Sequence, residues 1–255
     1  MSVSAHDTGG ARPREGGHHR GMAQGRFRAL VDRQVERIAA AVRVDEAARL
    51  ELTQTARELA AVVRTPWRVR ATKSAIAAAA TRGLDRIADV VVRHPAPVTD
   101  AGGLEQRANQ VRRGISAALT AVQGVLATST AATDGVGAPP AVAVDAAVAQ
   151  VASVLTGLAE WYLVGSYAVN LMRKAGIEPD ARRLRLVVNA ALLSRDRTLD
   201  ARMAQPDAEP RLIARWIGRG VLEAVPFLSA YPTQRVRRAG ERLEAVSPHA
   251  WPAEA

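Results

Sequence analysis

The feature that most constrains the fold is a long stretch without a basic residue, residues 114–172. The chain has 255 residues and 35 lysines and arginines, of which 20 precede this stretch and 15 follow it. The stretch is mostly apolar, and its only charged residues are Asp134, Asp145 and Glu160. A solvated face in so arginine-rich a chain would carry bases. We therefore expect either the central helical hairpin of a core or a segment that contacts lipid.

The composition around this stretch favours helices. Aromatic residues make up 4% of the chain, and the hydrophobic 48% is dominated by alanine, valine and leucine rather than by the residues that strands prefer. The chain has no cysteine, which excludes disulfides, cysteine-ligated zinc and thiol nucleophiles. We predict an all-α protein, a multi-helix bundle of seven or eight helices with a central apolar helical hairpin.

Breaks in the apolar pattern divide the chain into segments. Residues 1–24 are polar and glycine-rich and are expected to form a disordered tail. An N-terminal helical subdomain is expected over 25–93, with Asp45 capping one of its helices. Prolines and glycines at 94–103 predict a linker. A C-terminal apolar and basic helical domain follows over 104–246, with Gly176 ending its long apolar helix, and 247–255 form a second tail.

Two segments are long enough to span a bilayer but are only weakly apolar. Residues 114–133 are uncharged yet contain seven serines, threonines and glutamines, and residues 146–172 are interrupted by Gln150, Glu160 and Asn170. The first 25 residues contain no apolar core of a signal peptide. We expect a cytoplasmic protein that is at most peripherally bound to a membrane.

Catalytic motifs are absent from the sequence. It contains no HExxH, no P-loop, no GxSxG and no GxGxxG after a strand. Asp85 and Asp89 lie four residues apart, where two carboxylates could bind a metal, but Arg82, Arg86 and Arg93 surround them and favour a solvated ion-pair face. We expect no enzymatic activity, no cofactor and no metal site.

The strongest functional signal is arginine next to tryptophan. It occurs in two clusters, Arg64, Trp67, Arg68, Arg70 and Lys73, and Arg211, Arg215, Trp216 and Arg219. Arginine and tryptophan together at the edge of an apolar helix suit the headgroup layer of an anionic membrane. The partner expected from this pattern is an anionic lipid surface or a membrane protein complex. The structural alternative is that both tryptophans belong to the core under a solvated rim of arginines.

Nucleic acid is the competing partner. Residues 52–73 have the outline of a helix-turn-helix, in which a second helix beginning near Pro66 would present Arg68, Arg70 and Lys73. The net charge of +10 alone also attracts phosphates. A DNA-binding regulator is therefore the alternative function.

The C-terminal half resembles the EcsC family over about residues 114–246. The segment WYLVGSYAVNLMRKAGIEPDARRLRLVVNAALLS has a long apolar helix, a turn at residues 174–178 and a leucine-rich helix, in that order. In RLIARWIGRGVLEAVPFLSAYPTQRVRRAG, Val225-Pro226 and Arg235–Gly240 match a family turn and basic helix, whereas Leu228, Ser229 and Ala230 replace glycines. The resemblance implies a helical, apolar protein linked to transporter and secretion genes, and it supplies no catalytic residue.

Overall fold

The computed structural model describes residues 29, 32–34, 36–63, 69–131, 141–193, 208–223 and 234–251. No strand occurs in these ranges, which confirms the expected all-α class. Residues 36–41 are helical. The helices with complete bounds are α2 (Glu46–Val63), α3 (Val69–Arg93), α4 (Ala101–Ala131), α5 (Ala141–Lys174), α6 (Ala181–Leu193), α8 (Ala208–Glu223), α9 (Gln234–Ala245) and the 3₁₀ helix η1 (Pro248–Ala250).

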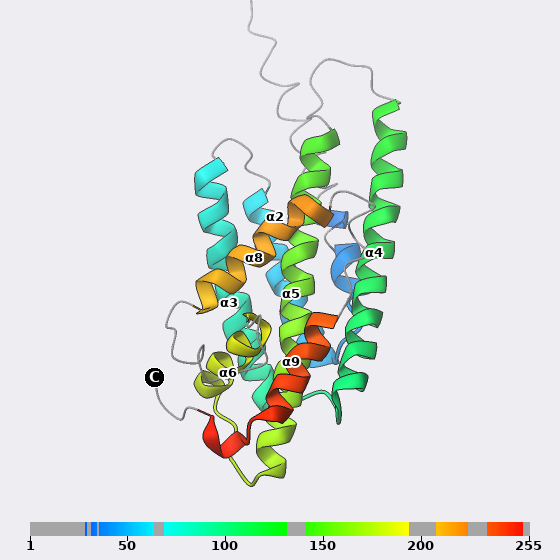
Figure 1. The fold of residues 1–255 in the computed structure, drawn as a ribbon. Coiled ribbons are helices and arrows are strands. Elements are labelled where there is room, and N and C mark those ends of the chain that lie inside the picture. Colours follow the sequence, from blue (N-terminus) through cyan, green and yellow to red (C-terminus); the bar gives the residue numbers. More distant parts are fainter. Residues whose placement is uncertain are drawn as a thin grey trace, which may run out of the picture.

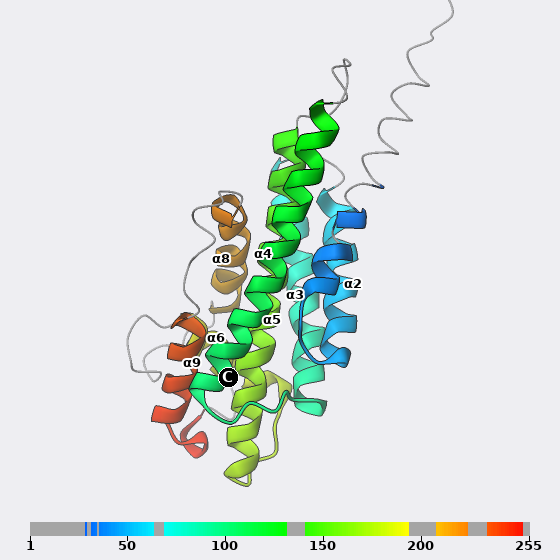
Figure 2. The same cartoon turned by 90° about the vertical axis from the view of Figure 1, so that its right-hand side faces the viewer.

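Helix α5 is the centre of the bundle. It packs against α2, α3, α4, α6, α8 and α9, as Figure 1 shows with α5 running through the middle of the molecule. Helices α4 and α5 lie side by side and antiparallel, and this pair is the predicted central apolar hairpin. Figure 2 shows α8 and α9 on one side of this pair and α2 on the other.

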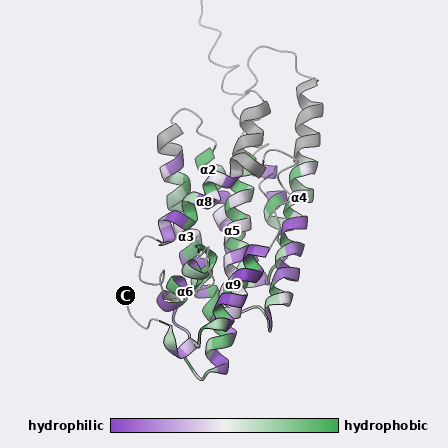
Figure 3. Ribbon diagram, viewed as in Figure 1, coloured by the Kyte–Doolittle hydropathy of each residue, from purple (hydrophilic) through white to green (hydrophobic). Residues whose placement is uncertain are grey.

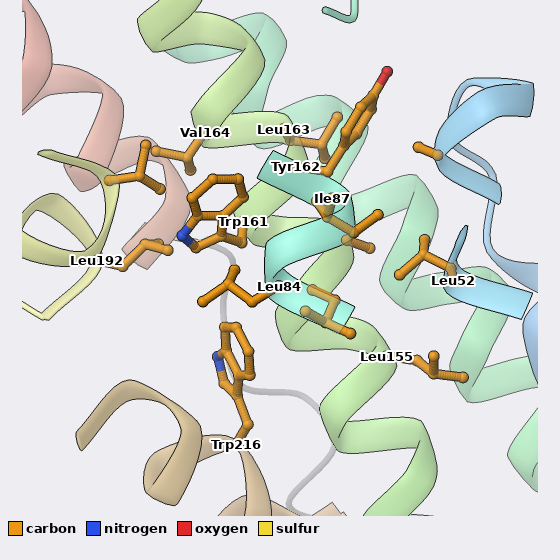
Figure 4. Close-up of a cluster of buried hydrophobic side chains, with 14 of the residues drawn as sticks. Leu52, Leu84, Ile87, Leu155, Trp161, Tyr162, Leu163, Val164, Leu192 and Trp216 are labelled. Atoms are coloured by element: carbon orange, nitrogen blue, oxygen red, sulfur yellow. The ribbon is translucent and has the colours of Figure 1, made fainter. Parts of the chain in front are cut away.

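The apolar side chains of α5 are used inside the protein. Trp161, Tyr162, Leu163 and Tyr167 are all buried, as expected for the thickest part of the core (Figure 4). Within the described residues, one helical segment is long and apolar enough to cross a membrane, Val148–Lys174, and 94% of its apolar window is buried in the bundle. Such burial is typical of the core helix of a soluble protein and favours the core over a lipid-contacting segment.

Residues at the helix ends explain where three helices begin or end. Asp45 caps α2, since the backbone N–H of Ala47 donates to its Oδ1 at 3.0 Å. Asp100 caps α4 in the same way, accepting from the N–H of Gly103 at 2.8 Å, so α4 begins three residues before the expected Leu104. After α5, Gly176 adopts a φ of +73°, which a glycine tolerates without strain, and it closes the helix as predicted.

The loop at 94–100, part of the predicted linker, is held against α5. Asn170 donates from Nδ2 to the carbonyls of Ala96 and Val98, both at 3.0 Å. The hydroxyl of Tyr162 donates to the carbonyl of His94 at 3.1 Å. The segments before and after this loop contribute to one continuous hydrophobic core that extends from residue 38 to residue 251. Figure 3 shows hydrophobic and hydrophilic residues alternating along the helices around that core.

Candidate functional site

The first predicted arginine–tryptophan cluster lies largely outside the described residues. Arg64, Trp67 and Arg68 belong to the segment between α2 and α3 that is not described. Arg70 is in the first turn of α3, and its side chain is not described either. Lys73 is exposed one turn further along α3. The predicted grouping of these five residues therefore stays a prediction.

The second cluster lies on α8, where its members face different surroundings. Arg211 is exposed, Arg215 is half-buried, and the side chain of Arg219 is 15% exposed. Trp216 is 1% exposed and packs on α5. Arg211 thus lies on the outer side of α8, whereas Arg219 lies 3.6 Å from the buried Glu160 of α5. Trp216 belongs to the core, as the structural alternative stated.

The fit of Trp216 depends on two small residues of α5. A Cβ added to Gly157 would lie 2.5 Å from the indole ring, so only a glycine leaves room for the ring there. The hydroxyl of Ser153 donates to the carbonyl of Trp216 at 2.7 Å. Figure 4 shows Trp216 directed from α8 toward α5. In this arrangement the indole contacts α5 and is not available to anchor in a lipid headgroup layer.

A buried carboxylate on α5 joins three helices. Glu160 is 1% exposed and accepts from Arg112 of α4 at 3.0 Å and from Arg235 of α9, while Arg219 of α8 lies 3.6 Å away. The side chains of these arginines are between 15% and 24% exposed, so all four charged groups are mostly withdrawn from water. One charge of −1 thus faces three charges of +1. We call these four residues the Glu160 cluster.

In the sequence, Glu160 stands out only as an interruption of an apolar stretch. A usable signal was present, because one acidic residue in the middle of a buried apolar helix needs a counter-charge. The sequence could not identify the partners, which lie 48 residues before and 75 residues after it among many other arginines.

The basic face of the bundle is formed by α8 and α9. Their apolar residues, including Leu212, Ile213, Val236 and Leu243, are buried. The two helices carry seven arginines and four glutamates, with Arg211, Arg237 and Arg238 exposed. Both helices lie on the same side of α5 (Figure 2). We call the outward side of α8 and α9 the α8–α9 face.

Some charges on this face are paired. Arg237 donates to Glu241 at 2.8 Å and lies 3.6 Å from Glu105 of α4. The hydrogen bond and charge of Glu241, followed by the charge of Glu105, raise the pKa of Arg237. Arg242 is buried and donates to the carbonyl of Ala191 at 2.8 Å, which fastens α9 to α6. Arg211 and Arg238 are exposed on this face, and Arg215 is half-buried.

The predicted helix-turn-helix region forms a different motif. Arg86 of α3 donates to Glu58 at 2.7 Å and to Thr55 at 3.0 Å, both on α2. Arg82, one turn earlier on α3, reaches Glu58 from the other side at 3.2 Å. Arg86 and Arg82 together lower the pKa of Glu58, although its desolvation opposes this shift. These pairs join α2 and α3 along an antiparallel hairpin, whereas the two helices of a helix-turn-helix cross at about 90–120°.

Asp85 and Asp89, the two carboxylates considered as a metal-binding pair, have different surroundings in the structure. Asp85 forms an ion pair with Arg185 of α6, and Arg185 also donates to Glu209 of α8 at 2.5 Å. Asp89 is exposed. The described part of the chain contains no group of three or more histidines and acidic residues close enough to hold a metal ion. The Asp85–Arg185–Glu209 chain links α3, α6 and α8. The ion-pair partner of Asp85 is thus an arginine of another helix, not one of the neighbouring arginines that the sequence indicated.

Comparison with known proteins adds no relative: no family model, no curated protein and no solved structure matches the chain. The resemblance to the EcsC family stays a prediction.

Proposed function

We propose that this protein is a non-enzymatic helical protein that binds the anionic lipid surface of the cytoplasmic membrane peripherally, through the α8–α9 face. The observation that carries the proposal is the orientation of these two helices. Both turn their apolar residues into the core and place exposed arginines on the same side of the bundle. Arginine near an anionic membrane surface contributes about 1 kcal/mol per residue to binding.

The proposed attraction is electrostatic. Among the described residues, Leu50 of α2 is the only large hydrophobic side chain that is exposed, at 63%, and α2 lies on the opposite side of the bundle. Trp216, which would otherwise anchor in the headgroup layer, packs against Gly157 of α5. Binding through charge alone implies a surface association that salt weakens.

The test compares vesicles of two compositions. The purified full chain is sedimented with vesicles of phosphatidylcholine containing about a third phosphatidylglycerol, and with pure phosphatidylcholine. We expect binding to the anionic vesicles only. The double variant Arg211→Gln, Arg238→Gln removes two bases from the face, so we expect about 30-fold weaker binding, from about 1 kcal/mol per base.

The matched control is Arg57→Gln, because Arg57 is an exposed arginine of α2 on the opposite side of the bundle. This variant has a lower net charge but an intact α8–α9 face, and we expect it to bind like the unmodified protein. If only total charge mattered, removing this one base would weaken binding about fivefold, half the free-energy effect of the double variant, and that result would overturn the proposed site.

The same experiment also tests the other two candidate partners, DNA and a membrane protein complex. Duplex DNA of two sequences is added in place of vesicles. Retention that depends on the DNA sequence at physiological salt would replace the proposal by the DNA-binding alternative, even though the α2–α3 hairpin lacks helix-turn-helix geometry. Binding to native membranes without binding to protein-free anionic vesicles would replace the lipid surface by a membrane protein complex.

A further inference from the structure

A cavity of about 910 Å³ lies away from the α8–α9 face. Its walls come from the segment before α2, the first turns of α2, the loop at 96–99, the N-terminal half of α4 and the middle of α5. Ligand sites for small molecules measure about 300–1,000 Å³, so the cavity is of that size. Of the features singled out in the sequence, Asp45 and part of the linker at 94–103 line it.

Three arginines and two carboxylates line the cavity: Arg43, Arg49, Arg107, Asp45 and Glu46. Asp45 caps α2 and contributes one negative charge, and Glu46 lies 3.7 Å from Arg49, so the lining carries a net charge of +1. Arg43 and Arg107 line the same cavity and form no ion pair with any described residue. Arg43 comes from the segment before α2 and Arg107 comes from α4. The cavity therefore has an excess of positive charge suited to an anion.

Neutral polar groups stand beside these arginines. Gln106 and Gln110, one turn apart on α4, line the cavity, and their side-chain amides can donate hydrogen bonds. Tyr162 also lines it, with its hydroxyl directed away from Trp161 and Trp216 (Figure 4). The Tyr162 side chain is buried, and its hydroxyl already donates to the carbonyl of His94.

The lining also contains apolar residues, and those with accessible surface are Ala40, Val44 and Pro97. Val42, Ala96, Val98 and Leu163 line the cavity as well, but they are at most 3% exposed and belong to the continuous hydrophobic core. A ligand that combines a charged group with a hydrocarbon part would satisfy both kinds of wall, since the charge can meet the arginines while the hydrocarbon leaves water.

We propose that this cavity binds a small amphipathic organic anion, a phosphate monoester with a short hydrocarbon part, held by Arg43 and Arg107. The phosphate accepts hydrogen bonds from the two guanidinium groups and from Gln106 and Gln110. The hydrocarbon part lies against Val44 and Pro97. This site does not depend on the membrane function proposed above, because the two sites share no residue.

The test uses three soluble probes below their micelle concentrations, with binding to the full chain measured by titration calorimetry. Octyl phosphate carries both parts of the proposed ligand, inorganic phosphate carries only the charge, and octyl glucoside carries only the hydrocarbon chain. We expect octyl phosphate to bind about tenfold or more tightly than either of the others, because each of them satisfies one wall alone.

Two variants and a control locate the site. Arg107→Gln and Arg43→Gln should each weaken octyl phosphate binding about tenfold, since each removes one charged hydrogen-bond donor. Arg57→Gln, on α2 but outside the cavity, should bind octyl phosphate unchanged. All three replace an arginine with some solvent exposure, and circular dichroism confirms that each variant remains helical.

Several outcomes overturn the assignment. No binding of octyl phosphate, equal binding of octyl glucoside, or equal binding of inorganic phosphate would each show that the cavity does not select an amphipathic anion. Unchanged affinity in Arg43→Gln and Arg107→Gln would place the bound probe elsewhere. Vesicle binding by these two variants is measured separately, so failure of the cavity proposal and failure of the membrane proposal remain distinguishable.

Discussion

At the scale of single residues, Glu160 has the largest effect that the structure predicts. Replacing it by Gln leaves Arg112, Arg219 and Arg235 mostly buried without their shared carboxylate. Breaking a buried ion pair by removing one partner costs about 3–5 kcal/mol. We expect Glu160→Gln to lower the free energy of unfolding by about that amount, measured by urea denaturation.

Glu241→Gln is the control for this prediction. Glu241 also pairs with an arginine, Arg237, but both side chains are about half exposed. Exposed pairs contribute about 0–1 kcal/mol, so the control should change stability only slightly. Similar losses in the two variants would mean that the Glu160 cluster is no more important than an ordinary surface pair.

A second residue-scale prediction concerns alkaline pH. Burial raises the pKa of Tyr162 to about 12 in the folded protein, above the ordinary value near 10 that the unfolded chain has. The folded state thus favours the neutral hydroxyl, and this contribution is complete below about pH 10 and is lost as the pH rises toward 12. We expect Tyr162→Phe to show a smaller loss of stability between pH 10 and pH 12 than the unmodified protein. Parallel pH profiles for the two would contradict the assignment.

At the scale of helices, the local sequence predicted the ends of the helices better than the contacts between them. Asp45 and Gly176 were identified as the start of α2 and the end of α5 because a cap acts on its own neighbours. The start of α4 was placed late because Asp100 was not recognised as its cap. The place of Trp216 was left open between surface and core, since the period of a helix shows which side is apolar but not which element covers it.

Helix packing gives a prediction with a matched pair of variants. Gly157→Ala places a methyl group within 2.5 Å of Trp216, whereas Gly218→Ala on α8 meets nothing within 4 Å. Overpacking costs about 1–3 kcal/mol, and alanine in an open helix position gains up to about 1 kcal/mol over glycine. In thermal unfolding we expect Gly157→Ala to be less stable than the unmodified protein and Gly218→Ala more stable. A neutral Gly157→Ala would mean that α8 does not pack on α5 as described.

At the scale of the whole molecule, the base-free stretch was the most informative part of the sequence. It predicted the buried helix α5 because a buried helix cannot carry unpaired bases. On α4, by contrast, Ile115 is the only buried residue among 114–121, the part of the stretch that is described there. The sequence did not indicate how the two predicted subdomains contact each other. Tyr162, Asn170 and Arg173 of α5 all donate to backbone carbonyls between Val92 and Val98, and these contacts join segments more than 60 residues apart. Prolines and glycines indicate a break in helix, but not whether the broken segment is fastened to another element.

The site was predicted less well than the fold because it, too, depends on contacts between segments that are far apart in the sequence. Arg211, Arg215 and Arg219 were identified from their spacing on one helix, yet Arg219 contacts Glu160 while Arg211 is exposed. The cavity beside Arg43 and Arg107 combines five segments and had no signal in any one of them.

The measurement that tests the central claim most directly is the salt dependence of binding to anionic vesicles. Between about 0.1 M and 1 M salt the Debye length falls from about 10 Å to about 3 Å, which screens exposed charges. If the α8–α9 face binds lipid through its arginines alone, sedimentation with anionic vesicles should be strong at the lower concentration and lost at the higher one, with no binding to neutral vesicles at either. Binding that persists at 1 M salt, or that is equal for neutral vesicles, would contradict this account.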